Sequence, residues 1–311
     1  MYSRFTALTD FEEKDLEKLR NCKVAVVGLG ATGSVIAEHL ARHGINLLIL
    51  DRDYLEENDV YSSNIYTPED CQDSIPKAVA AEKYLEKFTG IDSRVASLNP
   101  ENVDLLDGTD LIIDGTDNLE TRFLINEFSK KEEIPWIYTA AIGEKGYSMF
   151  FKEKCFNCVF DDINAGSLET CEVAGVLRES STAAASITST KAVKHLTGQT
   201  VEETLDTVEG DSFQVVSSGC DVCRDGSYSR LGSSRKTVAV CGENKYQLDT
   251  DIGAEGREKI REQGKVLSDN EYVLRSNING KEISVFSSGR IIVEANDKGH
   301  AESFVSETIG V

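Results

Sequence analysis

Four of the eight cysteines in this 311-residue chain form two C-x-x-C pairs, a spacing that could hold a metal ion. The first pair is Cys155 and Cys158, and the second is Cys220 and Cys223. Two such pairs supply the four thiolates of a closed, tetrahedral structural zinc site. A redox-active dithiol is the competing interpretation, and two matched pairs favour the metal over it. Because 61 residues lie between the pairs, we expect the zinc to join two distant loops rather than to build a compact finger.

A glycine-rich loop near the N-terminus has the composition of a phosphate-binding site. Gly28, Gly30 and Gly33 have the G-x-G-x-x-G spacing, and they follow the apolar run KVAVV. Such a loop, placed between a strand and a helix, binds phosphates through its backbone N–H groups and the helix dipole. Asp51 ends the next apolar run, where a carboxylate accepts the ribose hydroxyls of a nucleotide. This motif alone favours an ordinary NAD-binding fold, so it predicts a bound nucleotide and leaves the reaction open.

A second polar motif, Gly115-Thr-Asp117-Asn118, follows the apolar run 111–114. Ligands of parallel sheets bind at the carboxyl ends of the strands, where this motif is expected to lie. Asp117 is therefore predicted to reach a magnesium ion or the phosphates over the glycine loop. The alternative is that Asp117 or Asn118 caps the helix that follows. Both interpretations stay open on the sequence alone.

One further cysteine has a position that favours chemistry. Cys171 lies in a polar stretch just before a predicted helix, and a helix N-terminus lowers the pKa of a thiol. The alternative is a buried cysteine that acts as a small hydrophobic side chain. Cys22, Cys71 and Cys241 are interpreted as structural, and the four histidines show neither metal-ligand spacing nor a catalytic triad.

A parallel sheet is the scaffold that the hydrophobic pattern predicts for these residues. Short apolar runs alternate with helical segments along the first 140 residues, which indicates an α/β fold with a doubly wound, Rossmann-like, mostly parallel sheet. The expected strands are residues 23–30, 45–50, 94–98, 111–114 and 135–140, and the expected helices are residues 10–19, 31–43, 77–88 and 119–131.

The pattern changes after residue 143. Two short strands near 147–152, a polar stretch and a helix over 181–196 are expected to form a zinc-stabilised crossover region. Residues 224–235 are polar and are predicted to be a linker. A small α+β unit follows, with strands at 237–241, 272–275, 283–286 and 291–294 and helices at 254–263 and near His300. We therefore expect a domain of residues 1–224 with the zinc site and a domain of residues 236–311 with an unknown role.

Composition and charge exclude several classes of protein. The chain carries 33 Lys and Arg against 54 Asp and Glu, a net charge of −21. Such a surface repels phosphate backbones and anionic lipids, so nucleic acid and membranes are not expected as partners. No apolar run approaches the length of a membrane span. The first residues show no secretory signal, and we expect a cytoplasmic protein.

The motifs together resemble those of the ThiF/MoeB family. The glycine loop, GTDN, the paired C-x-x-C and the element T-C-E-V-A-G-V occur in this family's order, over about residues 1–224. These proteins are adenylyltransferases of sulfur-carrier proteins and relatives of ubiquitin-activating enzymes. The resemblance implies that Asp51 binds ribose, Lys77 binds phosphate and Asp117 is linked to magnesium. Arg122 and Asn126 match the family's D-N-x-x-x-R-x-x-x-N helix.

The resemblance also implies a reaction, cofactors and partners. The expected activity is ATP-dependent adenylylation of the C-terminal glycine carboxylate of a ubiquitin-like, β-grasp sulfur carrier ending in Gly-Gly, with magnesium and zinc present. Arg4 matches an N-terminal arginine that reaches the ATP of the neighbouring subunit, which implies a homodimer. Cys171 matches a crossover-loop cysteine that some members use for sulfur transfer or thioester formation. Sulfur delivery to thiamine, molybdopterin or tRNA, and protein tagging, all remain open.

The chain departs from the family at one point of the expected nucleotide site. The family has S-N-L-x-R-Q after the second strand, and the segment around Ser62 holds no such arginine, although Arg52 could supply a nearby charge. No rhodanese loop follows. Two alternatives therefore remain: an NAD-dependent oxidoreductase, and a nucleotide-sensing module without catalysis, which the altered segment at Ser62 suggests.

Overall fold

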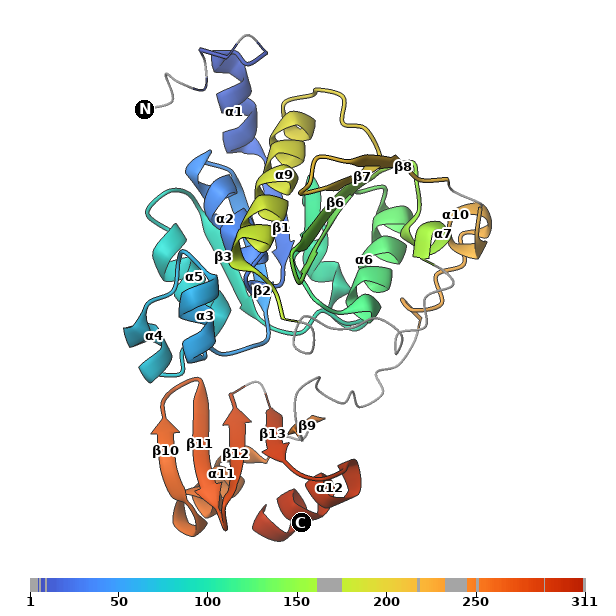
Figure 1. Cartoon of the computed structure of the whole chain (residues 1–311). Coiled ribbons are helices and arrows are strands. Elements are labelled where there is room, and N and C mark those ends of the chain that lie inside the picture. Colours follow the sequence, from blue (N-terminus) through green and yellow to red (C-terminus); the bar gives the residue numbers. More distant parts are fainter. Residues whose placement is uncertain are drawn as a thin grey trace. The chain divides into compact units, whose positions relative to one another are not determined.

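The computed structural model describes residues 5, 7, 8, 10–160, 175–216, 219–232, 245–249, 252–287 and 289–309 (Figure 1). The chain divides into two compact units. The first comprises residues 1–68 and 76–234, and the second comprises residues 69–75 and 235–311.

The first unit is built on an eight-stranded sheet with the order β3-β2-β1-β4-β5-β6-β7-β8. Its first five strands are parallel and the last three are antiparallel. The parallel strands are β1 (Lys23–Val27), β2 (Asn46–Asp51), β3 (Ile91–Val95), β4 (Leu111–Asp114) and β5 (Trp136–Ile142). The antiparallel strands are β6 (Lys145–Phe151), β7 (Thr204–Thr207) and β8 (Ser212–Gln214). The predicted mostly parallel α/β sheet is confirmed.

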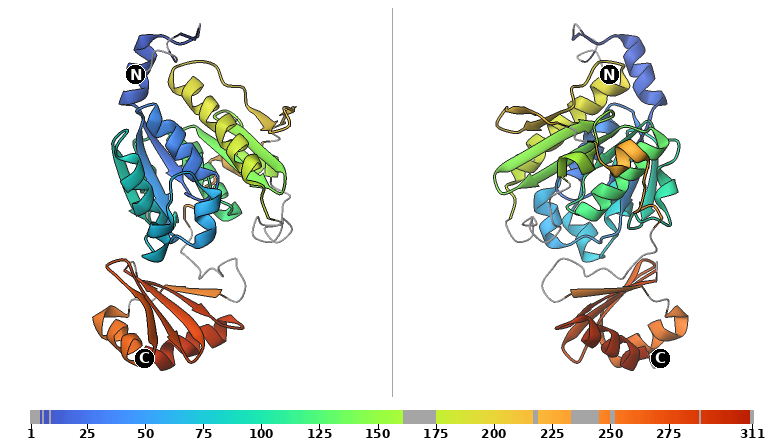
Figure 2. Two further views of the ribbon diagram at one scale, coloured as in Figure 1. Left: turned by 60° about the vertical axis from the view of Figure 1, so that its left-hand side comes forward. Right: turned by 90° about the vertical axis from the view of Figure 1, so that its right-hand side faces the viewer.

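Helices cover both faces of this sheet (Figure 2). On one face α2 (Gly33–Arg42) contacts both α5 (Lys77–Leu85) and α9 (Arg178–Leu196). On the other face α6 (Leu119–Glu132) lies beside α7 (Phe156–Phe160) and α10 (Asp221–Asp225). The described part of the unit also contains α1 (Glu13–Asn21), α3 (Glu57–Ser62) and a 3₁₀ turn at Val103–Leu106. The short helix α4 (Pro68–Gln72) belongs to the second unit apart from its first residue.

The direction of winding reverses between β1 and β4. The chain moves from β1 outward to β2 and β3, and then crosses to β4 on the other side of β1. This reversal opens a crevice at the carboxyl ends of the two strands, which is where open α/β sheets bind ligands. The glycine loop follows β1 and the GTDN motif follows β4, so both lie at this switch point.

Two expected strand positions in this unit are wrong. The strand expected at 94–98 is β3, which runs from Ile91 to Val95. Its residues are partly buried or exposed because β3 is the edge of the sheet. The two short strands expected near 147–152 are the single strand β6. A Cβ on Gly146, within β6, would lie 2.8 Å from the carbonyl oxygen of Ser180 on α9. The glycine therefore allows α9 to approach the sheet closely.

The second unit is a five-stranded antiparallel sheet with the order β10-β11-β12-β13-β9. Its core includes Ile260, Leu274, Ile283 and Ile291. The strands are β9 (Lys245–Asp249), β10 (Lys265–Asp269), β11 (Val273–Ile278), β12 (Lys281–Phe286) and β13 (Arg290–Glu294), and the helices are α11 (Gly253–Gln263) and α12 (Lys298–Ile309). The predicted C-terminal α+β unit is confirmed, while β9 and β10 were not expected and the strand predicted at 237–241 lies outside the described residues.

Among all the described helices of the chain, none combines the length and the apolar composition that crossing a bilayer requires.

Candidate nucleotide and metal sites

Three glycines bring the loop after β1 against the GTDN turn after β4. A Cβ added to Gly33 would lie 1.9 Å from the carbonyl oxygen of Gly28, and one added to Gly115 would lie 2.7 Å from the Cα of Gly33. Gly28 also has a φ of +87°, which only glycine adopts without strain. These contacts hold the two motifs together backbone against backbone at the switch point.

Gly30 differs from its neighbours because it faces open space. Apart from its two chain neighbours, no described residue has an atom within 4 Å of a Cβ placed on Gly30. The adjacent residue Leu29 is fixed, since its carbonyl oxygen accepts a 2.8 Å hydrogen bond from the hydroxyl of the buried Tyr66. The loop therefore presents a rigid backbone surface at Gly30 that a phosphate could approach closely.

We expect Gly30→Ala to fold as the wild type does and to bind ATP more weakly, because the added methyl group enters the space left for phosphate. Gly33→Ala should instead lower the thermal midpoint strongly, because its Cβ overlaps backbone. Thermal unfolding and equilibrium ATP binding of both variants check this pair. Equal effects of the two substitutions on stability would contradict it.

Asp51 lies directly beneath the glycine loop. Its carboxylate accepts hydrogen bonds from the backbone N–H groups of Leu29 (2.6 Å) and Asp53 (2.7 Å). Burial raises the pKa of Asp51 to about 6; the carboxylate of Asp53 acts in the same direction and Lys77 opposes both. The predicted ribose-binding carboxylate is thus fixed at the end of β2 and also holds the loop in place.

Lys77 begins α5 and lies beside the end of β2. Its ammonium group forms a 2.8 Å ion pair with Asp59, and both side chains are 14% exposed. Burial alone would lower the pKa of Lys77, but three nearby carboxylates outweigh burial and raise it; they belong to Asp51, Asp59 and Asp53. The structure therefore brings Lys77 and Asp51 together and keeps the lysine charged.

The GTDN turn separates two roles that the sequence left open. The side-chain oxygen of Asn118 accepts hydrogen bonds from the backbone N–H groups of Glu120 (2.8 Å) and Thr121 (3.3 Å), so Asn118 is the N-cap of α6. Asp117 is exposed and makes no hydrogen bond within the described part of the chain. Its carboxylate is consequently available to a ligand at the switch point.

Arg122 supports this turn from below. The guanidinium donates a 2.9 Å hydrogen bond to Asp114 and a further one to the carbonyl oxygen of Thr116. It also lies over the ring of Tyr138, 4.9 Å from its centre. Burial raises the pKa of Asp114, while the charge of Arg122 opposes this rise. Arg122 is thus a positioning residue for the backbone that carries Asp117.

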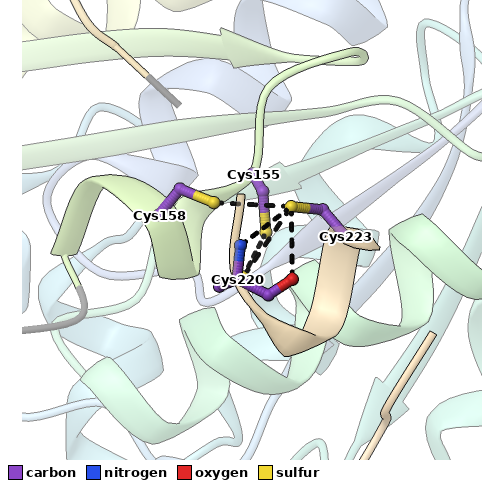
Figure 3. Close-up of side chains that lie close together, drawn as sticks. All are labelled: Cys155, Cys158, Cys220 and Cys223. Atoms are coloured by element: carbon purple, nitrogen blue, oxygen red, sulfur yellow. Dashed lines mark hydrogen bonds between the residues drawn. The ribbon is translucent and has the colours of Figure 1, made fainter. Parts of the chain in front are cut away.

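The four paired cysteines converge on one point (Figure 3). The sulfur atoms of Cys155 and Cys220 are 3.7 Å apart, those of Cys158 and Cys223 are 3.4 Å apart, and all four lie within 4.8 Å of one another. A tetrahedron with Zn–S bonds of 2.3 Å has sulfurs about 3.8 Å apart. Burial raises the pKa of Cys220 to about 12, so a metal ion must displace protons when it binds. The donor set and its spacing fit zinc.

Asn126 connects α6 to this cysteine cluster, a role that the sequence did not suggest. Its amide nitrogen lies 3.3 Å from the sulfur of Cys155 and donates a 2.8 Å hydrogen bond to Asn157. Its amide oxygen accepts from the backbone N–H of Phe156 at 2.9 Å. One helix therefore positions the GTDN turn at its start and a cysteine of the candidate zinc site along its length.

The segment after the second cysteine pair is not free along its whole length, as a flexible linker would be. The buried carboxylate of Glu127 on α6 accepts hydrogen bonds from the backbone N–H groups of Arg230 (2.8 Å) and Leu231 (3.2 Å). The guanidinium of Arg230 also lies over the ring of Phe123. The expected linker at 224–235 is thus held to the first unit in its middle.

Of the remaining predicted residues, two form local contacts and two lie outside the described residues. Arg4 and Cys171 are outside them. Arg52 forms an ion pair with Asp53 at 3.6 Å. The hydroxyl of Ser62 donates to the carbonyl oxygen of Asp59 at 3.3 Å, which closes the last turn of α3.

Comparison with known proteins places this site in a family. A family model described as "ThiF family" matches residues 2–218. The sulfur carrier protein ThiS adenylyltransferase of Bacillus subtilis is 28% identical, over 99% of this chain and 99% of the relative. The Escherichia coli protein of the same name is also 28% identical, over 71% and 94%. The SAMP-activating enzyme E1 of Haloferax volcanii is 26% identical, over 57% and 67%.

Solved structures share the fold at lower identity. Escherichia coli MccB crystallised with ATP has a TM-score of 0.56 and 14% identity, over 67% of this chain and 68% of that one. MccB in complex with N-formylated MccA has a TM-score of 0.58 and 15% identity. The matched residues include the glycine loop, GTDN and the first cysteine pair, whereas the second cysteine pair lies just beyond them. Because the family model matches more than two thirds of the residues, the chain belongs to the ThiF family.

Proposed function

We propose that this protein is an ATP-dependent adenylyltransferase that activates the C-terminal glycine carboxylate of a ubiquitin-like sulfur carrier. The observation that carries this proposal is the placement of charged groups on both sides of the glycine loop. Asp51 ends β2 and Lys77 begins α5 on one side, and the exposed Asp117 follows β4 on the other. End-to-end similarity to a ThiS adenylyltransferase supports the same activity and substrate class.

In the proposed reaction an oxygen of the carrier carboxylate attacks the α-phosphorus of ATP. The bond from that phosphorus to the bridging oxygen breaks, pyrophosphate leaves, and an acyl-adenylate forms. Catalysis of this kind depends mainly on positioning and electrostatics. Lys77 would offset phosphate charge, Asp51 would hold the ribose, and the carboxylate of Asp117 would bind the magnesium ion that accompanies ATP. Carrier-dependent exchange of pyrophosphate into ATP tests this assignment.

We assign zinc a structural role in this enzyme. Cys155 and Cys158 precede the segment that leads to α9, and Cys220 and Cys223 follow β8. A zinc ion would therefore tie both ends of the crossover region, together with Asn126 on α6, into one body. We propose that residues 1–224 form the adenylyltransferase domain and residues 236–311 a second domain. Because the proposed enzyme consumes ATP, we also propose that it acts in the cytoplasm.

The position of Phe5 supports the proposed homodimer. The ring of Phe5 packs 5.5 Å from that of His43, at the C-terminal end of α2. The glycine loop lies at the N-terminal end of the same helix, about 15 Å away at 1.5 Å per residue. Arg4 precedes Phe5 directly in the sequence. We propose that Arg4 acts at the ATP of a two-fold partner rather than at that of its own subunit.

Mixing two inactive variants tests the arrangement in trans. If Arg4 serves the neighbouring subunit, a dimer of Arg4→Ala with Asp117→Ala contains one intact site and one doubly damaged site. Random mixing gives about half mixed dimers, so roughly a quarter of wild-type activity should return. The measurement is pyrophosphate exchange after co-refolding, with subunit exchange verified by two affinity tags. Verified exchange without recovered activity would show that Arg4 acts within its own chain.

Cys171 is proposed as a nucleophile of the second step, after adenylylation. Cys171→Ser should then form acyl-adenylate at the wild-type rate and fail to support delivery of sulfur. Cys71→Ser is the control, because this thiol lies outside both the cluster and the crossover region. Unchanged sulfur delivery by the Cys171 variant would remove the residue from the mechanism.

A further inference from the structure

The cations already described at the carboxyl edge of the sheet are largely neutralised by their own neighbours. Lys77 is surrounded by three carboxylates. Arg52 is paired with Asp53, and Arg122 is paired with Asp114. A triphosphate adds several negative charges to this edge, and no arginine occurs between residues 53 and 93, the whole stretch from β2 into β3. The site therefore needs positive charge from another element.

Arg178, the first residue of α9, is a cation that lies at this edge of the sheet. The preceding residues are fixed beyond the end of β5 by two hydrogen bonds of 2.8 Å, from the N–H of Gly143 to the carbonyl of Gly175 and from the N–H of Leu177 to the carbonyl of Gly143. These bonds form a parallel bridge between Gly143 and Val176. The first turn of α9 is thus anchored at the carboxyl end of the parallel strands.

The charge of Arg178 is not compensated by the described part of the chain. Its side chain is exposed, and its single described hydrogen bond goes to the amide oxygen of Asn64. An amide oxygen orients the guanidinium without cancelling its charge. No described carboxylate forms an ion pair with it, in contrast to Lys77, Arg52 and Arg122.

Asn64 holds this guanidinium on the side of the glycine loop. The amide nitrogen of Asn64 donates to the carboxylate of Glu38 on α2, at 3.4 Å. Two residues further on, Tyr66 bonds to the carbonyl oxygen of Leu29 within the loop itself. Asn64 is therefore tied both to the helix that the loop opens and, through Tyr66, to the loop.

We infer that Arg178 binds the β- or γ-phosphate of ATP, with Asn64 as the residue that positions it. Guanidinium groups bind phosphate through paired, charge-assisted hydrogen bonds. Phosphate is favoured over the carrier carboxylate because Asn64 ties Arg178 to the glycine loop, which is the proposed phosphate-binding element. This inference deepens the proposed adenylyltransferase function and depends on it for the identity of the nucleotide.

Equilibrium binding of ATP and AMP to the full-length protein tests the inference without any carrier. Arg178→Ala should weaken magnesium-ATP binding about ten- to a hundredfold and leave AMP binding unchanged, because AMP lacks both outer phosphates. Arg178→Lys keeps the positive charge but loses the paired N–H donors of the guanidinium. Its affinity for magnesium-ATP should therefore lie between those of the wild type and Arg178→Ala. Glu179→Gln is the matched control on the same exposed turn of α9, and it should bind both nucleotides as the wild type does.

An unchanged ratio of ATP to AMP affinity in a folded Arg178→Ala or Arg178→Lys protein would overturn the inference. A raised KM for the carrier with unaltered ATP binding would also overturn it, and would assign Arg178 to the carboxylate instead. Carrier-dependent pyrophosphate exchange by the wild type tests the proposed function separately. If the wild type exchanges pyrophosphate but Arg178→Ala binds ATP normally, only the role of Arg178 is refuted. If the wild type does not exchange pyrophosphate, the proposed function itself fails.

Discussion

Cys155→Ser should lose the bound zinc and unfold well below the melting temperature of the wild type. Cys155 is fully buried and faces the three other sulfur atoms of the cluster. Structural zinc contributes on the order of 10 kcal/mol of apparent binding free energy, and that energy is available only to the folded chain. Without the ion, two segments separated by more than 60 residues lose their link, and the hydrogen bonds of Asn126 to this region lose their support.

Elemental analysis and thermal unfolding, each with and without a strong chelator, measure this effect. The wild type should carry one zinc per chain and unfold at lower temperature after chelation. Cys22→Ser is the control, because Cys22 lies outside the cluster and donates a hydrogen bond to the carbonyl of Lys18 that serine can keep. Freshly purified wild type without zinc, or a Cys155→Ser protein as stable as Cys22→Ser, would refute the structural role of the metal.

Asp117→Ala should leave the fold intact and slow adenylylation by at least about a hundredfold. Its side chain is exposed and makes no hydrogen bond within the described residues, so its removal costs little stability. Loss of a preorganised electrostatic group in an active site typically lowers kcat by a factor of about 10² to 10³. The neighbouring Asn118→Ala should show the opposite pattern and lose about 1 kcal/mol of stability, because Asn118 is the N-cap of α6.

Urea unfolding and single-turnover adenylylation of both variants separate the two roles. A destabilised Asp117→Ala protein with near-normal adenylylation would mean that Asp117 supports the turn and does not bind the metal. An Asn118→Ala protein as stable as the wild type would contradict the assignment of Asn118 as the N-cap of α6.

The central strands could be predicted from the sequence because both faces of each are buried. β1, β2 and β4 read as continuous apolar runs, and every residue of β4 is buried. The edge strands could not be predicted in the same way. All three residues of β8 are exposed, and β10 is exposed along most of its length, so neither has an apolar pattern. Their strand conformation depends on pairing with neighbours that a local pattern does not contain.

In the candidate site, too, the features that could be predicted are local in the sequence. The glycine loop, GTDN and the cysteine pairs are local motifs, and their spacing carries the chemistry in the sequence itself. The contact of Asn126 with Cys155 joins residues 29 positions apart, and that of Arg178 with Asn64 joins residues 114 positions apart. Such contacts depend on how α6 and α9 pack on the sheet, and no local motif in the sequence predicts them.

Exchange of labelled pyrophosphate into ATP, measured with and without a ubiquitin-like carrier ending in Gly-Gly, tests the proposed activity most directly. Exchange requires reversible formation of an acyl-adenylate, so it reports the first chemical step and no later one. The wild type should exchange label only when the carrier is present, and a carrier lacking its last glycine should not support it. A protein that binds ATP but exchanges no label with any such carrier, or one that binds NAD and transfers hydride, would contradict the assignment as an adenylyltransferase.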